Sequence, residues 1–381
     1  MTPSYDVVVV GGGPAGAAAA LALAGRGRAV LLADAPGGPP AVGEALPAAA
    51  RTLLRDLGAA ATVPGDGHLP CYANRSVWGS AVPASLDGIR DPHGPGWHLD
   101  RPLFDRRLRE AAAAAGAEVR AATARPAGRR ADGWTLTLHG GGPAAGPGAG
   151  VRCRWIVDAT GRRAAVATTH GARRLVGDRL VGLHLVLGAA PGPVDSTTLV
   201  EAVPDGWWYS APLPAGRLLL VTFTDADLPA ARTDPRLLRH RLAATGPTAA
   251  RAGARPFPPS AAPARAAAHT ARLDRVHGDG WTAAGDAAAA FDPLSSQGIL
   301  TALYTGRAAG LAVDAHLAGD PRALDRYAAA VADVVTAYRR NHATYYGLER
   351  RWPGRPFWRR RHPTGPDAAL SRPADPAAAG R

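Results

Sequence analysis

The sequence predicts a mixed α/β fold with a parallel-sheet domain, an inserted antiparallel sheet and a helical C-terminal segment. Three patterns support this prediction. A β-branched run precedes a glycine-rich turn and a small-residue helix near the N-terminus, short alternating strands fill residues 180–224, and a helical pattern follows Asp320. With 381 residues, 46% hydrophobic and 20% charged, the chain is long and apolar enough to bury a sizeable core.

The first forty residues predict a βαβ unit. Tyr5 to Val10 is a continuous β-branched run, typical of a strand that is buried on both faces. Gly11 to Gly16 reads as a turn, Ala17 to Gly25 as a helix of small residues, and Ala29 to Asp34 as a second buried strand.

The turn of this unit has the pattern G-x-G-x-x-G, formed by Gly11, Gly13 and Gly16 with Pro14 and Ala15 between them. In such a turn the first glycine allows the bend, the second lets a pyrophosphate approach and the third lets helix pack on strand. Asp34, at the end of the next strand, can accept hydrogen bonds from ribose hydroxyls. The pattern therefore predicts a dinucleotide site; the alternative is a purely structural glycine turn.

The elements that follow are read from periodicity and from glycine and proline positions. Helices are expected over 48–57 and 102–115, a hairpin over 134–139 and 151–157, a short strand over 281–285, a helix from about Ser296, and helical structure from Asp320 to about Arg351. Residues 58–96 show only a mixed, polar pattern, and the last twenty residues are expected to be mobile.

Two segments far along the chain each show a strand followed by an acidic residue and a turn, which indicates that their strand ends contact the same ligand as the first turn. They read WIVDATGRR (155–163) and WTAAGDAAAAFDPLSSQGI (281–299). A ligand reached from three strand ends is long. Asp286 suits a sugar-alcohol chain, and the helix after Pro293 would direct its positive end toward a ring that gains negative charge on reduction. These features favour FAD over NAD, although Gly285-Asp286 alone could be an ordinary turn.

The charge and the cysteine content exclude several classes of function. The formal net charge is +13, and all 44 basic residues other than histidine are arginine, which excludes lysine Schiff bases and a P-loop lysine. A solvated arginine-rich surface is favoured over nucleic-acid binding. Cys71 and Cys153 cannot form a disulfide framework or a four-cysteine zinc site, so no metal is expected. With no apolar stretch typical of a signal peptide or membrane helix, a cytoplasmic protein without membrane contact is expected.

The order GGGPAG, GE, RxxFD, DATGR and GDAAAAFDPLSSQGI resembles the FAD-dependent monooxygenases of the p-hydroxybenzoate hydroxylase fold group. The segments VEAVPDGWWYSAPLP (200–214) and YYGLERRWPGRPFWRRR (345–361) are similar to the branch that holds flavin-dependent tryptophan halogenases and the LodB/GoxB-type and QhpG-type maturation flavoproteins of quinone-cofactor enzymes. The resemblance covers Tyr5 to Arg361.

This resemblance implies non-covalent FAD, NADH or NADPH as reductant, and O₂ activated as a flavin C4a-hydroperoxide. It implies an aromatic substrate, which in the maturation branch is a Trp or Tyr side chain of a partner protein; a separate flavin reductase could also take part. The residues implied to bind FAD lie in four segments and at three single positions. They are Gly11, Gly13, Pro14, Ala15 and Gly16; Asp34; Glu44; Arg101; Thr160 and Gly161; Gly285 and Asp286; and Pro293, Ser295, Gln297 and Gly298.

The same resemblance sets expected domain limits. The FAD-binding domain is expected over 1–75, 97–178 and 275–315, in a Rossmann-like fold. The substrate-binding sheet is expected over 76–96 and 179–274, the helical segment over 316–361 and a disordered tail over 362–381.

No catalytic residue is assigned from the sequence, but four candidates are named. Glu44 could orient the flavin or be a helix-start carboxylate, and His98 could relay a proton or be a structural histidine. Trp207 and Tyr209 could shape a pocket or pack on the sheet.

The leading hypothesis is a monooxygenase that hydroxylates an aromatic group, with a peptidyl Trp or Tyr as one possible acceptor. A small-molecule hydroxylase, a halogenase-like tailoring enzyme and an alkene reductase of the geranylgeranyl type are the enzyme alternatives, and a flavin-holding assembly factor is the non-enzyme alternative. Flavin halogenases carry a lysine and a W-x-W-x-I-P segment, and this chain has neither. Oxygen transfer is therefore preferred.

Overall fold

The computed structural model describes residues 2–36, 45–60, 67–88, 91–140, 149–253, 255–257 and 262–362. The chain forms two compact units, each built from three separated segments. Unit 1 comprises Met1–Pro70, Gly96–Gly177 and His269–Asp333, and unit 2 comprises Cys71–Pro95, Asp178–Ala268 and Val334–Arg381. The domain limits expected from the sequence stay predictions.

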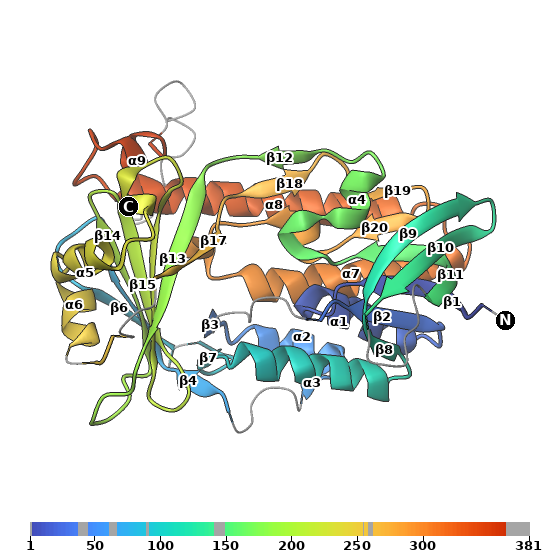
Figure 1. The fold of residues 1–381 in the computed structure, drawn as a ribbon, viewed down its shortest axis with the longest axis horizontal. Helices are drawn as coiled ribbons and strands as arrows, with labels where there is room; N and C mark the ends of the chain where they lie inside the picture. Colours follow the sequence, from blue (N-terminus) through green and yellow to red (C-terminus); the bar gives the residue numbers. More distant parts are fainter. Residues whose placement is uncertain are drawn as a thin grey trace, which may run out of the picture. The chain divides into compact units, whose positions relative to one another are not determined.

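Unit 1 is built on a sheet whose central strands are parallel (Figure 1). Its path is β19 (His277–Gly278), β20 (Trp281–Ala283), β11 (Ala149–Asp158), β1 (Ser4–Val10), β2 (Val30–Asp34) and β8 (Glu118–Ala121). β1 pairs in parallel with β2 and β11, and β11 with β20. Their carboxyl ends therefore meet at one edge of the sheet, which is the arrangement expected of a site built from three strand ends.

The predicted hairpin is confirmed. β10 (Gly133–His139) runs antiparallel to β11 and to β9 (Thr123–Arg130), with a register shift between Thr135 and Leu136. The indole N–H of Trp134 donates to the carbonyl of Gly280 at 2.8 Å, so the hairpin is also held to the turn that leads into β20.

Small residues let two helices of unit 1 approach closely. α1 (Pro14–Ala24) is buried along almost its whole length and packs on α7 (Gly298–Leu317) and α3 (Arg101–Ala114). A Cβ on Gly306 would lie 2.1 Å from the carbonyl oxygen of Ala15, and one on Gly310 would lie 2.8 Å from that of Ala19. Glycine at both positions therefore sets the distance between α1 and α7.

α1 begins at Pro14, three residues earlier than predicted, because proline is favoured in the first helical turn. The helices expected over 48–57 and 102–115 are confirmed as α2 (Ala50–Asp56) and α3, and the helix expected from about Ser296 is α7. α8 (Ala323–Leu348) is the helix expected after Asp320.

Unit 2 is built on a seven-stranded sheet in the order β17, β13, β16, β15, β14, β5, β6. All neighbours are antiparallel except β14 and β5. The strands span Ala264–Ala267, Leu180–Leu187, Leu218–Asp225, Gly206–Pro212, Thr197–Val203, Ala73–Val77 and Ala84–Asp87 in that order. The polar pattern of residues 58–96 did not predict β5 and β6, because these short strands near the sheet edge are largely exposed and lack clear alternation.

One face of this sheet carries the core of unit 2. Trp208, 1% exposed, packs with Leu185, Leu220 and the residues Leu238 and Leu242 of α5 (Pro235–Ala243). The opposite face is covered in part by aromatic side chains of the C-terminal segment, which includes α9 (Pro356–Arg359). Among the described residues, no helix combines the length and the apolar character that crossing a bilayer requires.

Candidate functional site

The turn after β1 has the geometry of a phosphate cradle. Gly11 has φ +109°, and a Cβ there would lie 2.3 Å from the carbonyl oxygen of Ala159. A Cβ on Gly16 would lie 1.8 Å from the carbonyl oxygen of Gly11, so only glycine fits either position. Gly13 differs, because a Cβ there would meet nothing within 4 Å. The space in front of Gly13 is open at the N-terminus of α1, which no side chain caps.

Asp34 closes this cradle at the end of β2. Its carboxylate accepts from the amide of Gly12 at 2.9 Å and pairs with the guanidinium of Arg109 at 3.2 Å. Arg109 also donates to the carbonyl of Gly12 at 3.1 Å. The carboxylate that the sequence predicts to face the ribose is thus fixed from two sides. Arg109 was not foreseen, since 97 residues separate it from Gly12.

The segment that follows β11 is held by its own aspartate. Asp158, fully buried, accepts from the amide and hydroxyl of Thr160 at 3.0 and 2.7 Å and from the amides of Val166 and Ala167 at 2.9 and 2.8 Å. It therefore caps α4 (Ala165–Thr169) and fixes the turn that contains Gly161. Gly161 has φ +66° and open space in front of it.

Asp286 follows β20 and lies among three arginines. Gly285 before it has φ +61° and donates its amide to Thr305 at 2.9 Å. The Asp286 side chain is 38% exposed, and its carboxylate lies 3.5 Å from the guanidinium of Arg162. Arg174 donates to the backbone carbonyl of Asp286 at 2.9 Å. Burial raises the pKa of Asp286, and the charges of Arg162, Arg174 and Arg101 lower it in part. A carboxylate that is buried on one side and open on the other is suited to accept from ligand hydroxyls.

The segment between Asp292 and α7 presents exposed backbone. Asp292 is buried and accepts from the amide of Leu294 at 2.9 Å, while Ser296 has φ +51°. Pro293, Gln297 and Gly298 are exposed and Ser295 is half-buried. The first turn of α7 has no side-chain cap, and this helix is 20 residues long, so its N-terminus offers free amides and a positive dipole end.

Arg101 begins α3 and is 8% exposed. Its guanidinium lies 3.3 Å from Asp105, one turn along the helix, and burial raises the pKa of the Asp105 carboxyl while Arg101 lowers it. Arg109 lies one further helical turn along α3, so Arg101, Asp105 and Arg109 form a row of alternating charges. The charge of Arg101 at one end of the row acts on Asp286, and Arg109 at the other end pairs with Asp34.

The remaining catalytic candidates lie elsewhere. Glu44 lies outside the described residues. His98 is 1% exposed on β7 (Gly96–His98), opposite Ala45 of β3 (Ala45–Leu46). Trp207 is fully buried in unit 2, where its indole N–H donates to the hydroxyl of Tyr346 at 3.0 Å and its ring stacks on Phe223 at 4.0 Å. These contacts give Trp207 a packing role, and catalysis by any of the four residues stays a prediction.

Tyr209 lies on the same face of the unit 2 sheet as Trp207 and is half-buried. One residue from each strand is in register with it across the sheet: Ala264, His184, Val221, Tyr209, Val200, Ser76 and Ala84. His184 was not singled out in the sequence, and burial lowers the pKa of its imidazole. The only available signal was its position in an otherwise apolar strand.

The described residues fit FAD. Gly11 and Gly16 shape a backbone cradle, and the open space at Gly13 lies where a pyrophosphate would approach. The buried Nε of Arg174, beside Asp286, has no hydrogen-bond partner among the described residues, and the N-termini of α1 and α7 are both free of side-chain caps. Anionic and hydroxyl-rich groups of a dinucleotide would satisfy such a donor set.

Comparison with known proteins agrees with this fit. A model of the family described as FAD binding domain matches residues 4–342. LodB of Marinomonas mediterranea, which is named as an FAD-dependent oxidoreductase, is 29% identical over 370 residues, 94% of this chain and 97% of its own.

Two solved structures are similar over most of the chain. QhpG, described as a peptidyl tryptophan dihydroxylase essential for tryptophylquinone cofactor biogenesis, has a TM-score of 0.79 and 28% identity over 95% of this chain and 79% of its own. The myxobacterial chondrochloren halogenase CndH has a TM-score of 0.82 at 20% identity, covering 97% of this chain and 88% of its own, and shares the fold. With its glycine cradle and a family match over most of its length, the chain belongs to the FAD binding domain family and is an FAD-dependent oxidoreductase.

Proposed function

We propose that this chain is an FAD-dependent monooxygenase that hydroxylates a Trp or Tyr side chain of a polypeptide on its way to a quinone cofactor. The observation that carries the proposal is the similarity to QhpG along 95% of the chain, at 28% identity. The similarity to LodB over 97% of that protein supports the same branch.

The proposed reaction uses NADH or NADPH and O₂. The nicotinamide gives up a hydride, which with one proton supplies the two electrons and the two hydrogens of the water that is formed. One oxygen atom of O₂ replaces hydrogen on the aromatic ring as a hydroxyl group, and the other leaves as water. FAD, when bound, supplies the redox chemistry, and the protein supplies binding, orientation and exclusion of water.

The chain's own residues then have distinct tasks. Gly11, Gly13 and Gly16, with Pro14 and Ala15, would hold the pyrophosphate, and Asp34 would accept from the adenosine ribose; the open backbone at Gly13 and the fixed Asp34 carboxylate support this. Arg101, Thr160 and Gly161 would line the middle of the cofactor, and Gly285 and Asp286 would bind the ribityl hydroxyls. Pro293, Ser295, Gln297 and Gly298 would hold the isoalloxazine, and the positive end of α7 beside them would favour negative charge there.

Halogenation is disfavoured by a feature of the whole sequence. The chain contains no lysine, and the flavin halogenases it resembles use a lysine. The 20% identity to CndH supports the shared fold alone.

The test is an anaerobic titration of the FAD-loaded protein with NADH or NADPH, followed by flavin absorbance. Bleaching by the nicotinamide, then O₂ consumption that rises with a Trp-containing polypeptide and yields a product 16 Da heavier, is the expected result. O₂ consumption driven only by free phenols or indoles would identify a small-molecule hydroxylase. If the flavin bleaches only when a flavin reductase is added, and product forms only when halide is present, the halogenase hypothesis would be favoured instead. No bleaching under any of these conditions would favour an assembly factor without turnover.

A further inference from the structure

Strand β17 is an open edge of the unit 2 sheet. It pairs with β13 on one side and, within the described part of the chain, with no strand on the other. All four of its residues are exposed, and three are alanines beside Arg265. Natural sheet edges are commonly protected by lysine, proline or a bulge, whereas small side chains leave the backbone N–H and C=O groups open to another extended chain.

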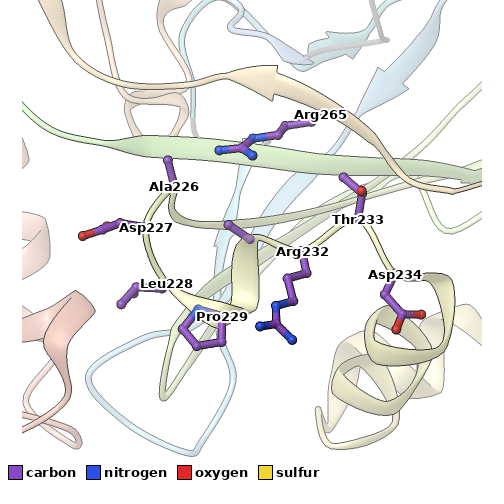
Figure 2. A pocket seen from close by; sticks show the side chains of 9 residues that line it. Ala226, Asp227, Leu228, Pro229, Arg232, Thr233, Asp234 and Arg265 are labelled. Carbon is purple, nitrogen blue, oxygen red and sulfur yellow. The ribbon is translucent and has the colours of Figure 1, made fainter.

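A recess of about 690 Å³ lies next to the edge strand, on the side of β13 and of the loop that follows β16 (Figure 2). The loop between β16 and α5 supplies its lining from Ala226 to Asp234, and β17 supplies Arg265. Arg265 thus joins the edge strand to the recess, and the surface that the two make belongs to unit 2.

The acidic and basic side chains of this surface differ in their partners. Asp234 caps α5 by accepting from the amide of Arg236 at 2.8 Å, and Asp227 pairs with Arg360 at 2.8 Å and Arg179 at 3.0 Å. Arg232 and Arg265 are exposed, and within the ranges that the structure describes neither forms an ion pair. The charge left for a ligand is therefore positive.

We propose that β17 and this recess bind an extended, acidic segment of the polypeptide substrate, which adds as a further strand to the sheet. Four residues in β conformation span about 13 Å, so backbone hydrogen bonds hold the segment while Arg232 and Arg265 select carboxylates on it. This inference rests on the proposed function, because it requires that the substrate be a polypeptide.

A second copy of this chain is a weaker occupant. The other edge of the sheet is β6, which carries Asp87, and β6 of one copy would have to pair with β17 of another. Such a contact joins two different surfaces and would extend into an open-ended chain of subunits rather than a closed dimer.

The test uses the full FAD-loaded protein and a fluorescein-labelled octapeptide that alternates aspartate with valine, with binding followed by fluorescence anisotropy. Replacing both arginines by glutamate, R232E/R265E, is expected to weaken binding at least tenfold. Arg75→Glu is the matched control, because Arg75 is exposed on β5 of the same sheet and should leave binding within twofold. The same octapeptide with N-methylated amides tests strand addition and should also bind at least tenfold more weakly. Hydrogen exchange should slow at Ala264–Ala267 when the unmodified peptide binds.

Three outcomes would overturn the proposal: no binding up to millimolar peptide, equal binding to R232E/R265E, or equal binding of the N-methylated peptide. Concentration-dependent self-association that R232E/R265E abolishes, without peptide binding, would assign the edge to a second copy. Flavin reduction and O₂ consumption are measured on the same samples. Octapeptide binding in a protein that consumes no O₂ with a Trp-containing polypeptide would contradict the proposed function alone. Normal O₂ consumption with that polypeptide but no octapeptide binding would contradict this inference alone.

Discussion

At the scale of single residues, the glycines of the first turn have separable tasks. Position 16 requires glycine because a Cβ there would clash with the carbonyl oxygen of Gly11, whereas a Cβ on Gly13 would meet nothing within 4 Å. Gly13 has φ −71°, which alanine also adopts, so Gly13→Ala should fold with an unchanged melting temperature of the FAD-free protein. Its methyl group should nevertheless lower FAD affinity at least tenfold, or about 1.4 kcal/mol, in a fluorescence titration.

Gly16→Ala is the matched comparison, and it should lower the melting temperature of the FAD-free protein as well. Unchanged FAD affinity in Gly13→Ala would mean that the pyrophosphate does not pass in front of this residue.

Asp286 provides a second residue-scale prediction, based on its charge. Its pKa is raised in the folded protein, so the ionised carboxylate costs stability that the protonated form does not, and this cost appears as the pH rises through the folded pKa. Asp286→Asn should therefore raise the melting temperature of the FAD-free protein at pH 7, and the gain should vanish at acidic pH. FAD affinity should fall, because an amide accepts from the ribityl hydroxyls less strongly than a carboxylate. A variant that gains stability and keeps full FAD affinity would remove Asp286 from the cofactor site.

At the scale of elements, the contact between α1 and α7 is set by backbone proximity. Gly306→Ala places a methyl group 2.1 Å from the carbonyl oxygen of Ala15, so the helices must separate. We expect a loss of about 1–3 kcal/mol in the free energy of unfolding, more than alanine gains from helix propensity, about 1 kcal/mol. Urea denaturation of the FAD-free protein measures it. Gly347→Ala in α8 meets nothing within 4 Å and should be neutral or stabilising; equal losses in both variants would argue against the packing explanation.

The segment after α8 is tied to the loop after β5 by a buried carboxylate. Glu349, fully buried, accepts from the amide of Gly79 at 2.8 Å and from the guanidinium of Arg351. Burial alone would raise the pKa of Glu349, but the hydrogen bonds from Arg351 and Gly79 outweigh it and lower the pKa. The stability that Glu349 contributes is thus present above its unfolded pKa and is lost as the pH falls through the folded one.

Glu349→Gln should accordingly destabilise the protein by about 1–3 kcal/mol at pH 7, because a charged acceptor is lost from a buried network. The difference from the wild type should shrink in acid, where the wild-type carboxyl is protonated too. Thermal unfolding from pH 7 down to pH 3 follows this trend, and a difference that stays constant with pH would contradict it.

At the scale of the whole molecule, FAD binding should change amide hydrogen exchange in several elements at once. FAD binding is expected to slow amide exchange together in residues 11–16, 158–161 and 285–298, which are far apart in the sequence. Mass spectrometry of peptides, with and without FAD, measures this. Gly13→Ala at the same FAD concentration is the control, and protection restricted to the seven-stranded sheet of unit 2 would contradict the proposed site.

Local patterns were enough to predict much of this architecture. The run of valines before Gly11 requires a buried strand, and the hairpin over 134–139 and 151–157 follows from alternation. β5 and β6 were missed because they are short and largely exposed, so no alternation marks them, and only the pairing of β5 with β14 and of β6 with β5 makes them strands. Arg109, Arg162 and Arg174 were missed for a related reason. In a chain with 44 basic residues, only the fold distinguishes an arginine that faces the site from one in solvent.

The separation of β1 from β20 along the chain has a consequence for synthesis. The parallel sheet of unit 1 joins β1, at Ser4–Val10, through β11 to β20, at Trp281–Ala283, and the strands of unit 2 are translated in between. A nascent chain on the ribosome therefore carries β11 without one of its neighbours until about three quarters of the protein has been made. Such an exposed strand edge attracts chaperones and is prone to aggregation, and contacts between distant segments form slowly. Expression at low temperature, with slower translation, should accordingly favour the cofactor-competent protein over inclusion bodies.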